Sequence, residues 1–293
     1  MAILAQLTAN GIIAGSIYAL VACGFSLIFT TTRFIHFAHG VAVAAGAYLL
    51  LALFSSLHLP FIVAVVGTLI LSAALGVLMH RGIYVPLQNR KASSVVLLIS
   101  SLGILIFGEN LIQLLFGANV RTIGYLPASR GMDIIGAIIT PLQLTIIIIS
   151  IILLALLFVL MYKTNVGRNL RAVADNKELA AIIGINHRKV TTIAFALGTM
   201  LAGVAGILIG LEQNLEPTMG TRLMLKGFTG AVVGGVSSVP ASILGSYILG
   251  LVENFGIWYL PSGYKDAIAF VLLFLFLLVK PAGLFGKDKG VKG

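Results

Sequence analysis

Apolar runs recur along this sequence, and each is long enough to cross a lipid bilayer as one helix. The clearest are residues 8–29, 61–79, 95–116 and 141–162, since about 20 apolar residues suffice for a crossing. Hydrophobic residues make up 59% of the 293 positions and charged residues only 10%, a balance that excludes a soluble domain. A β-barrel would show short alternating segments instead. The sequence therefore predicts an all-α polytopic membrane protein, with residues 1–293 forming one transmembrane domain.

The basic residues indicate how this domain sits in the membrane. The net charge of +10 is spread over the connections, so it reflects topology and not a nucleic-acid partner. Residues 163–189 carry six Lys and Arg, and the tail 280–293 is also basic, so both are expected on the cytoplasmic side. The first basic residue is Arg33, so the N-terminal run is expected to be a membrane span and not a cleavable signal peptide.

An even number of crossings must separate two cytoplasmic segments. Residues 190–211, 243–258 and 267–279 supply three, and the Gly-rich segment 223–236 would supply the fourth. This gives nine crossings, with the N-terminus outside and the C-terminus in the cytoplasm. A broken or re-entrant pair of half-helices around 223–240 is the alternative, because Gly-interrupted backbone survives at membrane depth only where protein or water satisfies it. We therefore expect about eight to nine transmembrane helices.

Residues 163–189 form the one long polar stretch between two of these spans. From Arg168 to Ile183 the chain has no Gly or Pro, and Gly184 stands where a left-handed residue would end a helix. Apolar residues fall roughly on one helical stripe there: Leu170, Val173, Ala174, Ala180, Ala181 and Ile183. The pattern predicts one short amphipathic helix on the membrane surface. It could cap two spans, or it could dock a soluble partner.

Polar residues inside the spans are candidates for function, because charge at membrane depth is costly. Glu109 and Asn110 lie in one span and Glu253 in another, and each could instead be a hydrogen-bonded packing residue. His39 has no second ligand at metal spacing, and Cys23 is expected to be a buried packing residue. Small residues spaced by four predict close helix contacts, although a Gly-rich chain also scatters them; these are Gly11, Gly15, Ala19 and Cys23, then Gly198, Ala202, Gly206 and Gly210.

No catalytic motif and no phosphate-binding loop occur in the sequence. The chain is therefore not predicted to be an enzyme, and it holds no cofactor of its own. An energised transporter built on it would need a separate ATPase. A secondary transporter is the rival, but its ion coupling would need more buried ionisable residues near the midplane. A scaffold or an intramembrane enzyme has no supporting residue set.

Three stretches together resemble the LivH-type permeases of branched-chain amino acid ABC importers. They are FIHFAHGVAVAAGAY at 34–48, the polar stretch with its Gly167, Arg168 and Gly184, and LKGFTGAVVGGVSSVPASILGSYILGLVE with the later KPAGLFG. The resemblance covers essentially the whole chain in order. His36 and Val41 depart from it, standing where Asn and an acidic residue are common. Related permeases import urea, amides or other amino acids, so these remain alternative substrates.

The resemblance implies a multi-pass protein of the prokaryotic cytoplasmic (inner) membrane, surrounded by membrane lipid. Its partners would be a LivM-like second permease, two ATP-binding-cassette ATPases that carry ATP and Mg²⁺, and a periplasmic or lipid-anchored amino-acid-binding protein. The implied coupling residues are Gly167, Arg168, Arg171, Ala172, Asp175, Ala180, Gly184 and Ile185. The candidates for the translocation path are Phe37, His39, Gly40, Glu109, Asn110, Gly234, Gly235 and Glu253.

Overall fold

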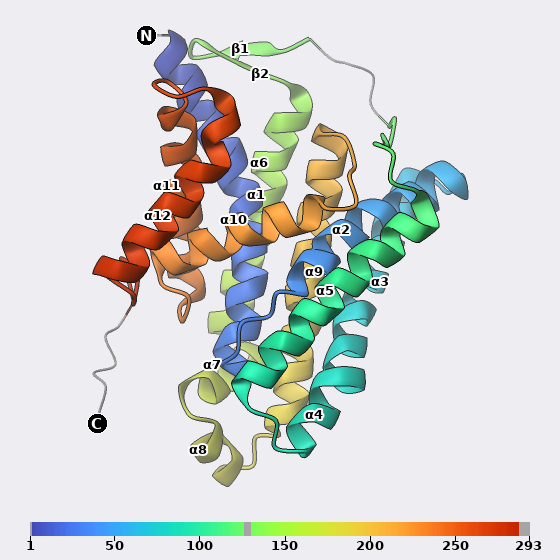
Figure 1. Ribbon diagram of the computed structural model, residues 1–293, viewed down its shortest axis with the longest axis vertical. Helices are drawn as coiled ribbons and strands as arrows, with labels where there is room; N and C mark the ends of the chain where they lie inside the picture. Colours follow the sequence, from blue (N-terminus) through green and yellow to red (C-terminus); the bar gives the residue numbers. More distant parts are fainter. Residues whose placement is uncertain (1, 126–129, 287–293) are drawn as a thin grey trace.

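A computed structural model describes residues 2–125 and 130–286 and shows an almost entirely helical protein (Figure 1). Within these residues, seven helices are long and apolar enough to cross a membrane. They are built on α1 (Ala2–Thr32), α2 (His39–Leu50), α3 (Phe61–Met79), α5 (Ser94–Phe116), α6 (Pro141–Lys163), α9 (His187–Glu212) and α12 (Lys265–Val279). The π-helical turns Leu51–Ser56 and His80–Tyr84 prolong α2 and α3, with α4 (Val85–Asn89) after the second, and a 3₁₀ turn, Ser262–Tyr264, precedes α12. The predicted all-α membrane fold is confirmed.

The helices form a buried centre and an outer ring. Most of α1 and α9 is buried inside the protein, whereas α3, α5, α6 and α12 turn most of their residues outward. The outward residues are large and apolar, such as Ile62, Phe107 and Leu278. Such surfaces suit contact with lipid chains or with another membrane protein.

Small residues set the distances between the central helices. In α1, Gly11 and Gly15 lie against Leu251 and Tyr247. Gly46 of α2 meets the backbone of Gly203 in α9 so closely that no Cβ would fit. Helices in lipid associate through such close packing, because lipid chains are as apolar as their side chains. In the predicted α9 series, Gly198 lies against the backbone of Gly24 and Gly206 against that of Val43, so the predicted role of the small-residue spacing is confirmed for α1 and α9.

The Gly-rich segment forms two helices, α10 (Met219–Gly234) and α11 (Val239–Gly256), which meet at 113°. In Figure 1, α10 lies across the molecule, and α11 then runs back to the end where α1 begins. Residues 223–236 therefore do not make a separate crossing. The expected ninth crossing is wrong, and the spans within the described residues number eight when the bent pair counts as one. As one span the pair would place the two termini on the same side of the membrane. As a re-entrant loop it adds no crossing, which leaves seven and keeps the termini on opposite sides, as nine crossings would.

Where the backbone is broken between these two helices, its polar groups form hydrogen bonds with other groups of the chain. Gly235 has a φ of 128°, and the Ser238 side chain accepts the Ala241 N–H to cap α11. The carbonyls of Val233 and Gly234 accept the N–H groups of Leu284 and Phe285, at 2.8 and 2.9 Å. The KPAGLFG signature therefore serves as a structural cap for the C-terminus of α10, whose last carbonyls have no partner within the helix.

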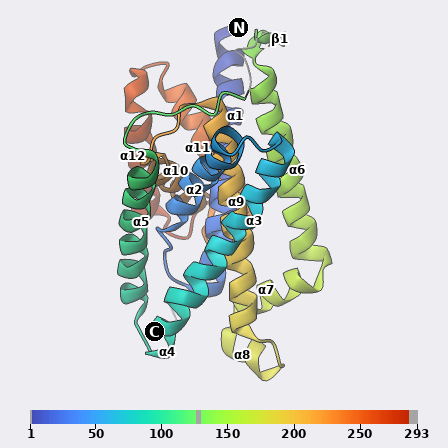
Figure 2. The same ribbon diagram turned by 90° about the vertical axis from the view of Figure 1, so that its right-hand side faces the viewer.

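Short elements close the two ends of the bundle. A hairpin of β1 (Met132–Ile134) and β2 (Ala137–Ile139) lies beside the start of α1. At the other end are α7 (Asn165–Asp175) and α8 (Lys177–Ile182). Figure 2 shows α7 and α8 beneath the long helices, away from the hairpin. The rest of the basic tail, residues 287–293, lies outside the described residues.

Candidate functional site

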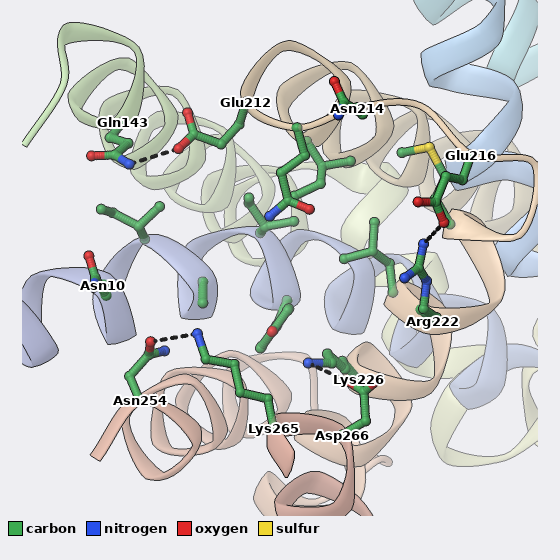
Figure 3. Close-up of a pocket in the computed structure, with 18 residues that line it drawn as sticks. Asn10, Gln143, Glu212, Asn214, Glu216, Arg222, Lys226, Asn254, Lys265 and Asp266 are labelled. Carbon is green, nitrogen blue, oxygen red and sulfur yellow. Dashed lines mark hydrogen bonds and ion pairs between the residues drawn. The ribbon is translucent and has the colours of Figure 1, made fainter. Parts of the chain in front are cut away.

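A polar cavity of about 610 Å³ lies among α1, α9, α10, α11 and α12, with one residue from α6 (Figure 3). Acidic and basic side chains both line it: Glu212, Glu216, Asp266, Arg222, Lys226 and Lys265. Ile13, Ile17 and Leu223 add an apolar wall. Charges of both signs beside an apolar wall are the features that a small zwitterion with an aliphatic side chain requires.

Lys226 of α10 is the centre of the polar contacts. Its Nζ lies 2.9 Å from Asp266 Oδ1 of α12 and 3.2 Å from Glu253 Oε2 of α11. The Tyr18 hydroxyl of α1 donates to the same Glu253 oxygen at 2.9 Å. Glu253 is fully buried, and its Oε1 has no hydrogen-bond partner. Lys226 therefore joins α10 directly to α11 and α12, and through Glu253 to α1.

Three further polar contacts hold the rim of the cavity. Gln143 Nε2 donates to Glu212 Oε1 at 2.7 Å, and Lys265 Nζ donates to Asn254 Oδ1 at 3.0 Å. Arg222 pairs with Glu216 at the more exposed end. Figure 3 shows these pairs on different sides of the cavity. The rim thus links α6 to α9 and α11 to α12.

Sequence reasoning found Glu253 but missed Lys226. A signal was present, because Lys226 is the only charged residue between positions 223 and 252. A lone Lys at membrane depth needs a counter-charge. Glu253 lies 27 residues further on, so only the bend between α10 and α11 brings the two together.

Six of the eight path candidates belong to α10, its C-cap or its contacts. Gly234 ends α10, Gly235 caps it, and Glu253 pairs with Lys226. The other three meet α10 near its N-terminus and its middle. Gly40 lies against the backbone of Gly220, the Thr221 hydroxyl donates to Glu109, and the rings of Phe37 and Phe228 are 6.2 Å apart.

The remaining two candidates lie elsewhere. His39 is fully buried, with its Nε2 3.2 Å from the Val21 carbonyl oxygen of α1. Asn110 is exposed on α5, and its Nδ2 donates to the Ile106 carbonyl one turn back. The structure thus gathers the candidates around one helix and leaves His39 and Asn110 apart from it.

The second candidate site is the polar stretch at the other end. It forms two helices and not the single one expected, because Asn176 is extended and ends α7. The Asn176 side chain accepts the N–H groups of Glu178 and Leu179, which starts α8. Asn favours such capping positions over helix interiors. Gly184 has a φ of 84° and ends α8 with the hydrogen bond from Ile185 N to Ala180 O, so the predicted left-handed stop is confirmed.

The implied coupling residues divide into an inner and an outer group. Gly167 and Ala180 are buried, and Ala172 and Ile185 are partly buried against the core. Arg168, Asp175 and Gly184 are exposed. Arg171 is partly buried, with its guanidinium carbon 4.7 Å from the centroid of the Tyr162 ring.

An exposed apolar surface on this element was missed. Leu179, Ile182 and Ile183 are 60%, 80% and 72% exposed. The expected stripe had Ile183 facing the membrane, but the break at Asn176 rotates α8 relative to α7. Three large aliphatic side chains at the end of the molecule thus point away from the protein.

Two basic side chains fasten this element to α1. Lys177 Nζ donates to the Thr32 carbonyl at 3.3 Å, and the Arg33 guanidinium donates to the Ala174 carbonyl. Burial lowers the pKa of Lys177, and the nearby charge of Arg33 lowers it further. The lower end of α1 and the junction between α7 and α8 are therefore held together.

Comparisons with known proteins agree with this architecture. The chain is 33% identical over 295 residues to the high-affinity branched-chain amino acid transport system permease protein LivH of Salmonella typhimurium, covering 96% of this chain and 94% of that protein. It is 32% identical over 299 residues to the corresponding permease BraD of Pseudomonas aeruginosa, covering 97% and 96%. The solved PsaBC structure from Streptococcus pneumoniae, in complex with a Fab, has the same fold, with a TM-score of 0.52 at 16% identity over 96% of this chain and 92% of that one.

A family model described as the permease component of branched-chain amino acid transport systems matches residues 7–277. The match covers nearly the whole chain, including α7, α8, α10 and α11. The chain therefore belongs to the family of branched-chain amino acid transport system permease components.

Proposed function

We propose that this chain is the membrane-spanning permease subunit of an ATP-binding-cassette importer for Leu, Ile and Val. Family membership supports the reaction class, and the chain itself carries no phosphate-binding loop. A second, LivM-like permease completes the path, and a periplasmic or lipid-anchored protein delivers the amino acid. Two separate ATPases bind ATP and Mg²⁺. The N-terminus lies outside and the C-terminus in the cytoplasm of a prokaryotic inner membrane.

The observation that carries this proposal is the exposed apolar surface of α8. An element that only covers the ends of two spans would pack its large aliphatic side chains against the protein, whereas Leu179, Ile182 and Ile183 are exposed. An apolar patch on an otherwise charged loop is typical of a protein interface. The ATPase is the occupant that fits, because it approaches from the side of the basic loop.

The connection from this surface to α10 runs along α1. Lys177 and Arg33 hold its lower end, the Ser26 hydroxyl donates to Val236 O in the bend between α10 and α11, and Tyr18 contacts Glu253. A displacement of α7 and α8 would therefore reach, through one helix, the bend and the contacts among Lys226, Tyr18, Glu253 and Asp266, called here the Lys226 cluster. ATP binding drives such a change only if the ATPases contact the two states differently.

Reconstitution tests the assignment. The chain, the second permease, the two ATPases and the binding protein are placed in proteoliposomes, and uptake of labelled leucine is measured with and without ATP. We expect ATP-dependent uptake, and competition by isoleucine and valine. Uptake of urea or a short amide in place of leucine would keep the importer class and reject the substrate. Uptake driven by an ion gradient without ATP would support the secondary transporter.

A variant links transport to the α8 surface. Ile182→Ser with Ile183→Ser should abolish retention of the ATPases and reduce uptake at least about tenfold, while the thermal midpoint of the isolated chain stays within experimental error. Ile135→Ser is the matched control, because this Ile is 94% exposed on the hairpin at the opposite end. Normal ATPase retention in the double variant would refute the docking role of α8.

A further inference from the structure

A second crevice lies at the level of α7, between α6 and α11, and shares no residue with the cavity around Lys226. It has a volume of about 180 Å³. Its apolar lining includes Leu154, Leu157, Phe158, Met161 and Ile243. Its polar lining includes Thr30, Arg171, Ser237 and Ser238. The crevice is therefore amphipathic, with one positive charge.

Arg171 supplies that charge. Its guanidinium lies over the Tyr162 ring at the end of α6, 4.7 Å from the ring centroid. The ring holds a cation but does not neutralise it. Arg171 is partly buried and lines the crevice. Its guanidinium is thus directed toward the end of α6.

The crevice lies where the lipid headgroups should be. It is lined by the last turns of α6 and by Thr30 near the end of α1, and α7 lies beneath both helices in Figure 1. Most of the apolar lining belongs to α6, most of whose residues lie at the surface of the chain. A ligand with a negative headgroup and an apolar chain would meet both kinds of lining at this depth.

We propose that this crevice binds an anionic phospholipid from the leaflet next to α7. The Arg171 guanidinium would hold the headgroup phosphate with two parallel hydrogen bonds, a geometry that suits Arg better than Lys. Ser238 Oγ already accepts the Ala241 N–H, which leaves its O–H free to donate to the same phosphate. The first carbons of a chain would lie along Leu157, Met161 and Ile243, with the rest in the bilayer.

Such a lipid would contact both α7 and the start of α11. Arg171 belongs to α7, and Ser237 and Ser238 belong to the bend after α10. Basic pockets beside membrane helices on the cytoplasmic side attract anionic headgroups. Occupancy would brace α7 against the re-entrant pair without taking part in substrate binding.

A fluorescence titration tests this site. Phe158 lines the crevice, so Phe158→Trp places a reporter there, and Trp258→Phe removes the only native Trp. The full chain is held in phosphatidylcholine nanodiscs that contain increasing fractions of brominated phosphatidylglycerol, which quenches Trp on contact. We expect brominated phosphatidylglycerol to reach half-maximal quenching at a mole fraction of the nanodisc lipid at least about fivefold lower than brominated phosphatidylcholine does.

Two variants and one control decide the outcome. Arg171→Gln should remove the preference for phosphatidylglycerol, whereas Arg168→Gln, an exposed Arg on the same helix, should keep it. Ile243→Trp fills the apolar part of the crevice and leaves Arg171 in place, so it should weaken the binding of both lipids. Because the new Trp would also be quenched, binding to this variant is measured as retention of tritiated lipid. Equal quenching by the two lipids in the parent chain, or an unchanged preference in Arg171→Gln, would overturn the proposal. Displacement of the lipid by millimolar inorganic phosphate would reassign the site to a free anion.

Discussion

At the scale of single residues, the Lys226 cluster sets the free energy lost by dehydrating a carboxylate against the free energy gained from its contacts. A buried carboxylate such as Glu253 is tolerated only with a partner, because the loss of hydration costs several kcal/mol per ion. Lys226 and Tyr18 both contact its Oε2. The cluster therefore fixes the position of α10 relative to α1, α11 and α12 as long as all its members are present.

Removing the cation should expose this dependence. We expect Lys226→Met to destabilise the chain by about 3 kcal/mol, because Glu253 would be left as an uncompensated charge. A fall in the thermal midpoint in detergent measures the effect. Adding Glu253→Gln to Lys226→Met should recover at least about half of the loss, since no buried charge would remain.

An exposed ion pair on the same helix serves as the control. Arg222 and Glu216 have side chains that are 54% and 42% exposed, and exposed pairs contribute about 0 to 1 kcal/mol. Arg222→Met should therefore change the thermal midpoint much less than Lys226→Met. Equal losses from the two variants would contradict a special role for the buried pair.

At the scale of helices, the central packing depends on absent side chains. Gly46 faces the Gly203 backbone without room for a Cβ. Gly46→Ala should push α2 away from α9 and destabilise the chain by about 2 kcal/mol, within the range for overpacked cores. Gly82→Ala is the matched control, because its nearest neighbour, Leu78 Cδ1, would be 3.8 Å from the new Cβ. Comparing the two thermal midpoints separates the contact from the general effect of Gly→Ala.

The same scale shows what sequence patterns could and could not predict. The spans, the small-residue spacing and the stop at Gly184 depend on local chemistry, and all were predictable. The break at Asn176 was not predicted. Helix propensity favours a continuous helix there, but the Asn side chain competes by capping a new one. The direction of α10 was not predictable, since it depends on contacts from distant segments. The N–H groups of Leu284 and Phe285 reach α10 from about 50 positions further along the chain.

The candidate site shows the same division. Polar residues at membrane depth are visible in the sequence, and this reasoning found Glu109 and Glu253. Lys226 escaped notice because its partners come from α11 and α12, which only the fold brings together. The α8 surface escaped notice because its orientation follows from the cap at Asn176.

At the scale of the whole molecule, one side of the protein combines exposed apolar residues with exposed amides. Figure 2 places α5 and α12 on the same side, and in Figure 1 α12 lies toward the left, α5 toward the right and α10 runs across between them. On α5, Asn110 and Gln113 are exposed, and a Cβ at Gly103 would meet nothing within 4 Å. Exposed amides inside a membrane span are costly in hydrocarbon. This side is therefore where we expect the second permease, with the path between the two chains.

Cysteine crosslinking tests this placement, because the chain has one natural Cys, and Cys23 is fully buried. Asn110→Cys, paired with single cysteines scanned along the second permease, should give a crosslinked heterodimer in native membranes. Leu156→Cys on α6 should not, because α6 lies on a different side of the molecule (Figure 2). A crosslink that changes in yield when ATP is added would show that the interface moves during transport. Crosslinks through Leu156 and none through Asn110 would move the expected path to the α6 side, away from the candidates gathered around α10.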